Sequence, residues 1–288
     1  MKKVNIDRHT AQAHVAAAET LEGKTLGVAG FGHLGSSIVS SLLAHGFPKE
    51  RLLISCGGRA ETRERARAAG LARCLTDTAS LMRRADIILL AARPQNLTDF
   101  RGLAVKEGAF LLSFMAGISL ETLHRVFGAE LCRVMCSGPE TITDGLGLGV
   151  SFPSEARSGA VLEAAGLKVF DLSCESELDS FTVGICLPPI LLNIEIDEGE
   201  KRTALLEMSK RYPVYRELAP WIDRVIAAHA GEKSAAALAN VSTKGGVTEA
   251  MTTALQNGAS FSQALVAGLS RNDELCCELR RRFAASAA

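Results

Sequence analysis

The chain has 288 residues, of which 47% are apolar and 22% are charged, and this composition excludes an intrinsically disordered protein. Its 32 Lys and Arg residues balance 32 Asp and Glu residues, so the formal net charge of zero disfavours a general binder of nucleic acids or of anionic membranes. The strongest apolar run, residues 87–92, has the size of a strand, whereas a membrane span needs roughly 20 apolar residues. The N-terminal region lacks the leucine-rich segment of a secretory signal, so we expect a cytoplasmic protein.

The eight cysteines show no spacing that is typical of a zinc site. Cys132 and Cys136 form a pair, but no second pair of ligands follows at the required distance. Cys276 and Cys277 are adjacent in a helical pattern and should point in different directions. We therefore expect no metal site, and thiols that are buried or scattered in a reducing compartment.

In chain order, an alanine-rich helical extension at residues 7–20 precedes an alternation of strands and helices. The predicted strands are residues 24–29, 51–55, 86–91, 109–115, 132–135, 150–152 and 168–172. The predicted helices are residues 35–45, 61–69 and 120–127, with a helix end at 80–84. This alternation predicts a Rossmann-type, doubly wound parallel sheet, and the unbroken apolar run DIILLA suits a strand covered by helices on both faces.

Beyond about Glu175 the pattern is almost entirely helical. We therefore expect an α/β protein in which the Rossmann-type sheet is followed by an all-α dimerisation domain. The expected parts are a helical N-terminal extension at residues 1–20, an NADP-binding domain at 21–174 and an α-helical substrate and dimerisation domain at 175–288. Long apolar stretches at residues 235–241 and 261–269 predict a homodimer through the helical domain, with higher oligomers open.

The strongest local motif is a glycine-rich turn that follows the first strand and begins a helix. Gly30 permits the tight turn, Gly32 lets the backbone approach a pyrophosphate, and Gly35 allows the helix to pack closely on the strand. The amide groups at the start of the helix would hold the anion. All six residues are candidates for cofactor binding: Gly30, Phe31, Gly32, His33, Leu34 and Gly35.

The end of the second strand bears on the choice of cofactor. An NAD site usually has Asp or Glu there, but this chain reads Ser55-Cys56-Gly57-Gly58-Arg59. Ser55 can donate a hydrogen bond to a 2′-phosphate and Arg59 can supply charge, so NADPH is favoured. The alternative is that Arg59 is only a solvated charge at a helix start. The alternating charges of Glu61, Glu64 and the arginines at 63, 65 and 67 indicate a solvated helix face.

Several longer segments resemble the NADPH-dependent pyrroline-5-carboxylate reductases in order and spacing. They are GVAGFGHLGSSIVSSLLAHG, ADIILLAARPQ, FMAGISLETL and CRVMCSGPE in the first domain, and NVSTKGGVTEAMTTALQNGASFSQALVAGLSRNDEL near the end. The resemblance covers about residues 27–152 and 240–275. It implies a Rossmann domain, a helical dimerisation domain, and reduction of a cyclic imino acid to a proline-type amino acid. Active sites in that family form where the helical domain of one subunit meets the cofactor domain.

The resemblance also assigns roles to individual residues. Ala92, Arg93 and Pro94 correspond to a segment beside the cofactor, and Ala116 and Gly117 to a loop that lets the dinucleotide lie flat. Thr243 matches a residue that binds the substrate carboxylate, next to Gly245 and Gly246, and Thr248 matches a threonine near the imine nitrogen.

The residues themselves support a site of this kind. We expect Ser242, Thr243 and the amides of Gly245 and Gly246 to offer a small anion site at a predicted helix start, which would suit a carboxylate. The alternative is that Ser242 and Thr243 only cap the helix. Thr248 is the candidate catalytic residue; because a hydroxyl is a poor acid, we expect it to orient the imine more than to protonate it.

Three segments depart from the family pattern. Met135-Cys136-Ser137-Gly138-Pro139 stands where the family has Met-Pro-Asn-Thr-Pro, and Gly184-Ile185-Cys186-Leu187-Pro188 stands where it has Ser-Gly-Ser-Gly-Pro. Lys244 replaces a proline before the glycine pair. These changes surround the substrate, so the sequence leaves open pyrroline-5-carboxylate or a substituted or larger-ring relative.

Two other functions remain open. One is a catalytically silent NADP-binding regulator, because the altered residues at 136–138 are compatible with a loss of catalysis. The other is a reductase related to β-hydroxyacid dehydrogenases, which need a Lys and an Asn on a helix after the first domain. Against it, Asn193 has no lysine at helical spacing before Lys201.

Overall fold

The structure is a computed structural model that describes residues 17–231 and 244–285. Of the predicted N-terminal extension, residues 1–16 lie outside the described part and residues 17–20 are helical. The chain forms two compact units. The first unit runs to Asp171 without Met135–Gly138, and the second comprises Met135–Gly138 together with the chain from Leu172 onward.

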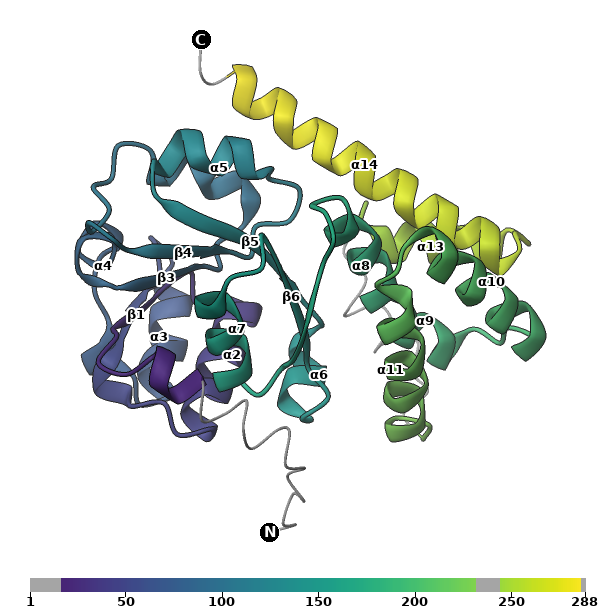
Figure 1. The fold of residues 1–288 in the computed structure, drawn as a ribbon, viewed down its shortest axis with the longest axis horizontal. Helices are drawn as coiled ribbons and strands as arrows, with labels where there is room; N and C mark the ends of the chain where they lie inside the picture. The colour runs from purple at the N-terminus through teal and green to yellow at the C-terminus, as the bar shows by residue number, and fades with distance from the viewer. Residues whose placement is uncertain (1–16, 232–243, 286–288) are drawn as a thin grey trace. The chain divides into compact units, whose positions relative to one another are not determined.

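The first unit is built on a seven-stranded sheet with the order β2-β1-β3-β4-β5-β6-β7 (Figure 1). Its strands are β1 (Leu26–Ala29), β2 (Leu52–Ser55), β3 (Ile87–Leu90), β4 (Phe110–Ser113), β5 (Glu130–Cys136), β6 (Leu148–Phe152) and β7 (Lys168–Asp171). The pairs β1–β2, β1–β3, β3–β4, β4–β5 and β6–β7 are parallel. The strand order reverses between β1 and β3, which is the position where doubly wound sheets bind ligands.

Helices cover both sides of this sheet, with α5 on one side and α2 and α7 on the other (Figure 1). The helices of the unit are α2 (His33–Ala44), α3 (Ala60–Ala68), α4 (Thr78–Arg84), α5 (Leu120–Phe127), α6 (Pro139–Thr143) and α7 (Ala156–Ala164). Short 3₁₀ segments are η1 (Lys49–Arg51), η2 (Ala72–Cys74) and η3 (Pro94–Phe100). Because both faces are covered, every residue of β1, β2, β3 and β4 is buried, as the run DIILLA predicts.

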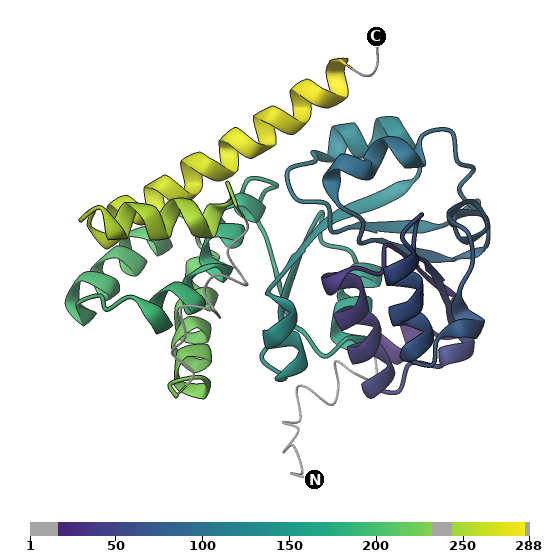
Figure 2. The same cartoon turned by 180° about the vertical axis from the view of Figure 1, so that it is seen from behind.

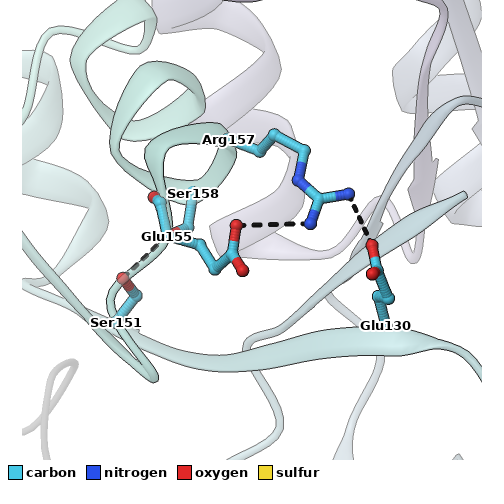
Figure 3. Close-up of polar contacts among 5 residues, drawn as sticks. All are labelled: Glu130, Ser151, Glu155, Arg157 and Ser158. Atoms are coloured by element: carbon cyan, nitrogen blue, oxygen red, sulfur yellow. Dashed lines mark hydrogen bonds and ion pairs between the residues drawn. The ribbon is translucent and has the colours of Figure 1, made fainter.

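Helix α7 is not among the predicted helices, and polar contacts tie it to the sheet (Figure 3). Arg157 donates to Glu130 at the start of β5 (2.8 Å) and to Glu155 (3.2 Å). The hydroxyls of Ser151 in β6 and Ser158 in α7 lie 2.8 Å apart, and Ser158 also donates to the carbonyl of Glu155 (2.7 Å). The helix is therefore held both to the preceding strand β6 and to β5, whose Glu130 lies 27 residues before Arg157.

The second unit is helical. Its described helices are α8 (Glu177–Ile185), α9 (Leu187–Asn193), α10 (Glu198–Arg211), α11 (Tyr215–Ala228), α13 (Val247–Gln256) and α14 (Phe261–Ala285). The long α14, drawn in yellow, lies beside α13 in both views (Figures 1 and 2). Phe181, Tyr215, Trp221 and Phe261 are the largest fully buried side chains of this unit. Across the described residues, no helix has both the length and the apolar character that a membrane span requires.

Candidate cofactor and substrate site

A pocket of about 1320 Å³ opens in the first unit at the carboxyl ends of three neighbouring strands. Its lining comes from the segments after β1 (Gly30–Leu34), β2 (Ser55–Arg59) and β3 (Ala91–Arg93), and from η3 and Phe114. The register brings these ends together, because Ala29 pairs with Ser55 on one side and with Leu90 on the other. The pocket therefore lies at the point where the strand order reverses.

The glycine-rich turn has a backbone that only glycine fits at two positions. Gly30 has a φ of +107°, and a Cβ there would lie 2.6 Å from the backbone nitrogen of Ala92. A Cβ on Gly35 would lie 2.1 Å from the carbonyl oxygen of Gly30, so α2 packs directly against the turn. Gly35 therefore acts by close packing and is not among the lining residues.

The turn also presents a suitable site for an anion. Gly32 is the N-cap of α2 and provides no side-chain cap for that helix. The first amides of a 12-residue helix therefore face the pocket together with the positive end of the helix dipole. A close-packed glycine turn at a helix start is the arrangement that holds a dinucleotide pyrophosphate, so these residues fit the cofactor that the sequence implies.

The segment after β2 lines the pocket with polar and cationic groups. Ser55 is buried, and its hydroxyl accepts a hydrogen bond from Thr78 (3.1 Å) while keeping its own proton to donate. Arg59 is the exposed N-cap of α3. Three carboxylates also line the pocket, those of Glu61, Asp77 and Asp99. Asp77 is the N-cap of α4 and accepts from the Ser80 amide at 2.8 Å, and Asp99 accepts from the side-chain amide of Asn96 at 3.0 Å.

The predicted solvated face of α3 is exposed and also borders the pocket. Arg63, Arg65 and Arg67 line it, and Arg67 pairs with Glu64 at 2.6 Å. Burial raises the pKa of the Cys56 thiol, while the charge of Arg63 acts in the opposite direction, so that guanidinium lies near the segment after β2. The lining residues that the sequence analysis does not identify include Cys56, Thr62, Arg63, Asn96, Asp99, Phe100 and Phe114.

The remaining cofactor candidates divide into two groups. Ala92 and Arg93 line the pocket directly after β3, and Arg93 is the N-cap of η3. Pro94, Ala116 and Gly117 are not among its lining residues. Gly117 has a φ of +75°, in a loop that follows β4.

The second unit holds the substrate candidates at the start of α13. Gly246 is its N-cap, so Thr248 is the second residue of the helix. Gly245 has a φ of +70°. Ser242 and Thr243 lie outside the described residues.

Thr248 is buried next to a residue from an altered segment. Only 6% of its surface is exposed. Burial raises the pKa of the Cys186 thiol, and a hydrogen bond with Thr248 opposes that rise, so the two side chains are neighbours. Cys136 and Ser137, from the other altered segment, are also buried in this unit, and burial raises the pKa of Cys136 to about 12. Both altered segments therefore contribute to its interior.

Comparisons with known proteins agree with this architecture. Residues 25–117 match a family described as NADP oxidoreductase, coenzyme F420-dependent. The pyrroline-5-carboxylate reductase of Haemophilus influenzae is 25% identical over 277 residues, which cover 88% of this chain and 98% of that protein. Among solved structures, a pyrroline-5-carboxylate reductase from Coxiella burnetii has a TM-score of 0.57 at 19% identity, and one from Streptococcus pyogenes has 0.56 at 18%. Each covers 88% of this chain and 98% of its own.

The sheet, its glycine turn and the helical second unit define a nicotinamide-dependent oxidoreductase of the Rossmann type. The similarity that extends along both units supports the pyrroline-5-carboxylate reductase family, at low identity. The expected fold class is thereby confirmed, and this similarity supports the expected family.

Proposed function

We propose that this protein uses NADPH to reduce a cyclic imino acid to a proline-type amino acid. The observation that carries the proposal is the pairing of two features on one chain. The first unit has a glycine-rich turn that suits a dinucleotide. The second unit has a Gly-Gly turn at a helix start, with the buried Thr248 two residues later. The relative from Haemophilus influenzae, which matches over both units, is named for reduction of pyrroline-5-carboxylate.

The chemistry requires a hydride on the imine carbon and a proton on the nitrogen. Bound NADPH supplies the hydride. In the proposal, the amides at the start of α13 hold the substrate carboxylate, which fixes the ring. The Thr248 hydroxyl then orients the ring nitrogen by a hydrogen bond. Because a hydroxyl is too weak an acid to be the main source of the proton, the nitrogen takes its proton from water.

NADPH is preferred over NADH because the segment after β2 offers Ser55 and Arg59 to a 2′-phosphate, with Arg63 on the same pocket wall. Ser55, Arg59, Ala92 and Arg93 are the proposed contacts beyond the glycine turn.

The substrate ring is proposed to be larger or more substituted than that of pyrroline-5-carboxylate. Support comes from the altered segment at residues 184–188, where Leu187 and Pro188 are buried and Cys186 is next to Thr248. Each additional buried methylene would contribute about 0.8 kcal/mol, a several-fold preference per carbon.

A panel of cyclic imines, followed by the loss of NADPH absorbance, tests the proposal. Imines with a carboxylate next to the ring nitrogen should be reduced, and ring homologues without the carboxylate should react far more slowly. Thr248→Val should lower kcat while NADPH affinity is unchanged; Thr253→Val, at an exposed position of the same helix, is the matched control. No turnover of any imine would favour a catalytically silent NADP-binding regulator, and equal turnover without the carboxylate would overturn the proposed anchor.

The helical unit is also proposed to form a homodimer. Leu206 and Val266 are the large apolar side chains that the described part of the chain leaves exposed, at 56% and 55%, and both belong to this unit. Sedimentation of the full chain at micromolar concentration should give a dimer, and a monomer would refute this part of the proposal.

A further inference from the structure

In the Gly-Gly turn before α13, both the carbonyl and the amide of Gly245 are hydrogen-bonded to side chains. The Nε of Arg271, on α14, donates a hydrogen bond to the carbonyl oxygen of Gly245 at 2.7 Å. The carboxylate of Glu249, on α13 itself, accepts a hydrogen bond from the Gly245 amide. The backbone of Gly245 is thus fixed by side chains from two different helices, and one of these side chains, that of Arg271, lies 26 positions further along the chain.

These two hydrogen bonds of Gly245 determine which backbone amides are available to an anion. Because Glu249 takes the N–H of Gly245, that amide is not free for a substrate carboxylate. The amides of Gly246, Val247 and Thr248 belong to the helix start and have no hydrogen-bond acceptor among the described residues. The amides that can bind a carboxylate are therefore those of the first turn of α13, directly after Gly245.

The charge of Arg271 is already balanced. Its Nη1 pairs with Glu274 at 2.7 Å and with Glu278 at 3.4 Å, and its side chain is 25% exposed. An arginine with two carboxylate partners has little charge left to attract a third carboxylate. Its hydrogen bond to the turn is therefore a geometric contribution, and the φ of +70° at Gly245 is the conformation that the bond maintains.

We propose that Arg271 is a positioning residue, whose hydrogen bond to Gly245 aims the free amides of Gly246, Val247 and Thr248 at the substrate carboxylate. The inference rests on the proposed function, because it assigns the carboxylate of that substrate to these amides. The competing explanation is that Arg271 only ties α14 to α13 through the contacts between the two helices.

The variants Arg271→Met and Arg271→Lys, with Glu274→Gln and Glu278→Gln as controls, separate the two explanations. The controls each weaken an ion pair of Arg271 and leave its Nε free to bind Gly245. Arg271→Met, whose side chain has the same reach as Nε but no donor, should raise KM for the imino acid roughly ten-fold, with kcat and the KM for NADPH within about two-fold of the wild type. Arg271→Lys, which keeps an ammonium donor on a long side chain, should recover part of the loss, and the controls should keep the wild-type KM.

Hydrogen exchange provides a readout that does not depend on turnover. In Arg271→Met the amide of Gly245, which donates to Glu249, and that of Ala250, which donates to the Gly246 carbonyl, should exchange faster, while those in the middle of α13 keep their wild-type rates. An unchanged KM for the imino acid, unchanged exchange at Gly245 and Ala250, or controls that raise KM as much as Arg271→Met would each overturn the inference. If the wild type reduces no imine that carries a carboxylate, the proposed function fails, and the exchange rates still decide whether Arg271 holds the turn.

Discussion

Replacing Arg59 with alanine is expected to weaken NADPH binding and to leave NADH binding unchanged. Arg59 is the N-cap of α3, its side chain is exposed, and it lines the pocket near Ser55. No carboxylate forms an ion pair with it among the described residues, so the guanidinium can turn toward a 2′-phosphate. That phosphate is the only group by which the two cofactors differ.

The size of the effect follows from exposure. Two unit charges at about 4 Å interact with about 1 kcal/mol in bulk water and about 4 kcal/mol near a protein surface. Because Arg59 is exposed and Arg63 on the same wall remains in the variant, we expect the lower part of this range. A loss of about 1–2 kcal/mol corresponds to NADPH affinity that is roughly 5- to 30-fold weaker.

Titration of the full chain with each cofactor measures this loss directly. Arg84→Ala is the matched control, since it removes the same charge from an exposed position of α4 that does not line the pocket. The loss in Arg59→Ala should shrink as the salt concentration rises, because the contact is exposed. Equal wild-type affinity for NADPH and NADH, or equal losses in Arg59→Ala and Arg84→Ala, would refute the reasoning.

Three further expectations concern stability. Gly35→Ala places a Cβ 2.1 Å from the Gly30 carbonyl oxygen, so it should cost about 1–3 kcal/mol in thermal unfolding and abolish NADPH binding in a titration. Tyr215→Phe should raise the free energy of unfolding by about 1 kcal/mol in urea, since the buried Tyr215 hydroxyl has no partner among the described residues. Burial raises the pKa of Asp86, but hydrogen bonds from Lys106 and a backbone amide outweigh it and lower the pKa. The stability that Asp86 contributes over Asp86→Asn should therefore be complete above roughly pH 4 and disappear as the pH falls through the lowered pKa in denaturation series; a difference that persists at the acid end would contradict this.

The sheet could be predicted because its signal is local. The run DIILLA is apolar at every interior position, and the structure buries all of β3, as it does β1, β2 and β4. Strand boundaries shift by one or two residues, as at β4, which is shorter than predicted, and β5, which is longer. Helix α2 begins at His33, two residues before the predicted start, because the last residues of the glycine turn are already helical.

Helix α7 could not be predicted in the same way. Its sequence, ARSGAVLEA, contains a glycine and no clear apolar stripe. Its buried Ser158 is paired with Ser151, 7 residues earlier on the preceding strand, and its Arg157 with Glu130, 27 residues earlier at the start of β5. Contacts of this kind override local propensity and leave no periodic signal.

The arginines of α3 show a related limit. Their alternation with Glu61 and Glu64 indicates an exposed helix face, and the face is exposed. Periodicity separates buried from exposed positions, but it does not show which exposed face borders a pocket. That depends on where α3 starts relative to the ends of β1 and β3, which is a property of the assembled sheet.

The cofactor pocket and the proposed substrate residues therefore differ in how much the sequence reveals. The cofactor pocket depends on backbone shape, and shapes that exclude a Cβ, as at Gly30 and Gly35, require glycine and leave a recognisable motif. The proposed carboxylate site depends on a backbone carbonyl held by Arg271 and on the side chains near Thr248, among them Cys186. Every residue has a backbone carbonyl, so a contact to a carbonyl leaves no sequence motif. Side chains around a substrate can also change while the amides that bind its carboxylate are kept. The same physical difference explains why the cofactor class follows from the sequence, whereas the ring of the substrate must be found by assay.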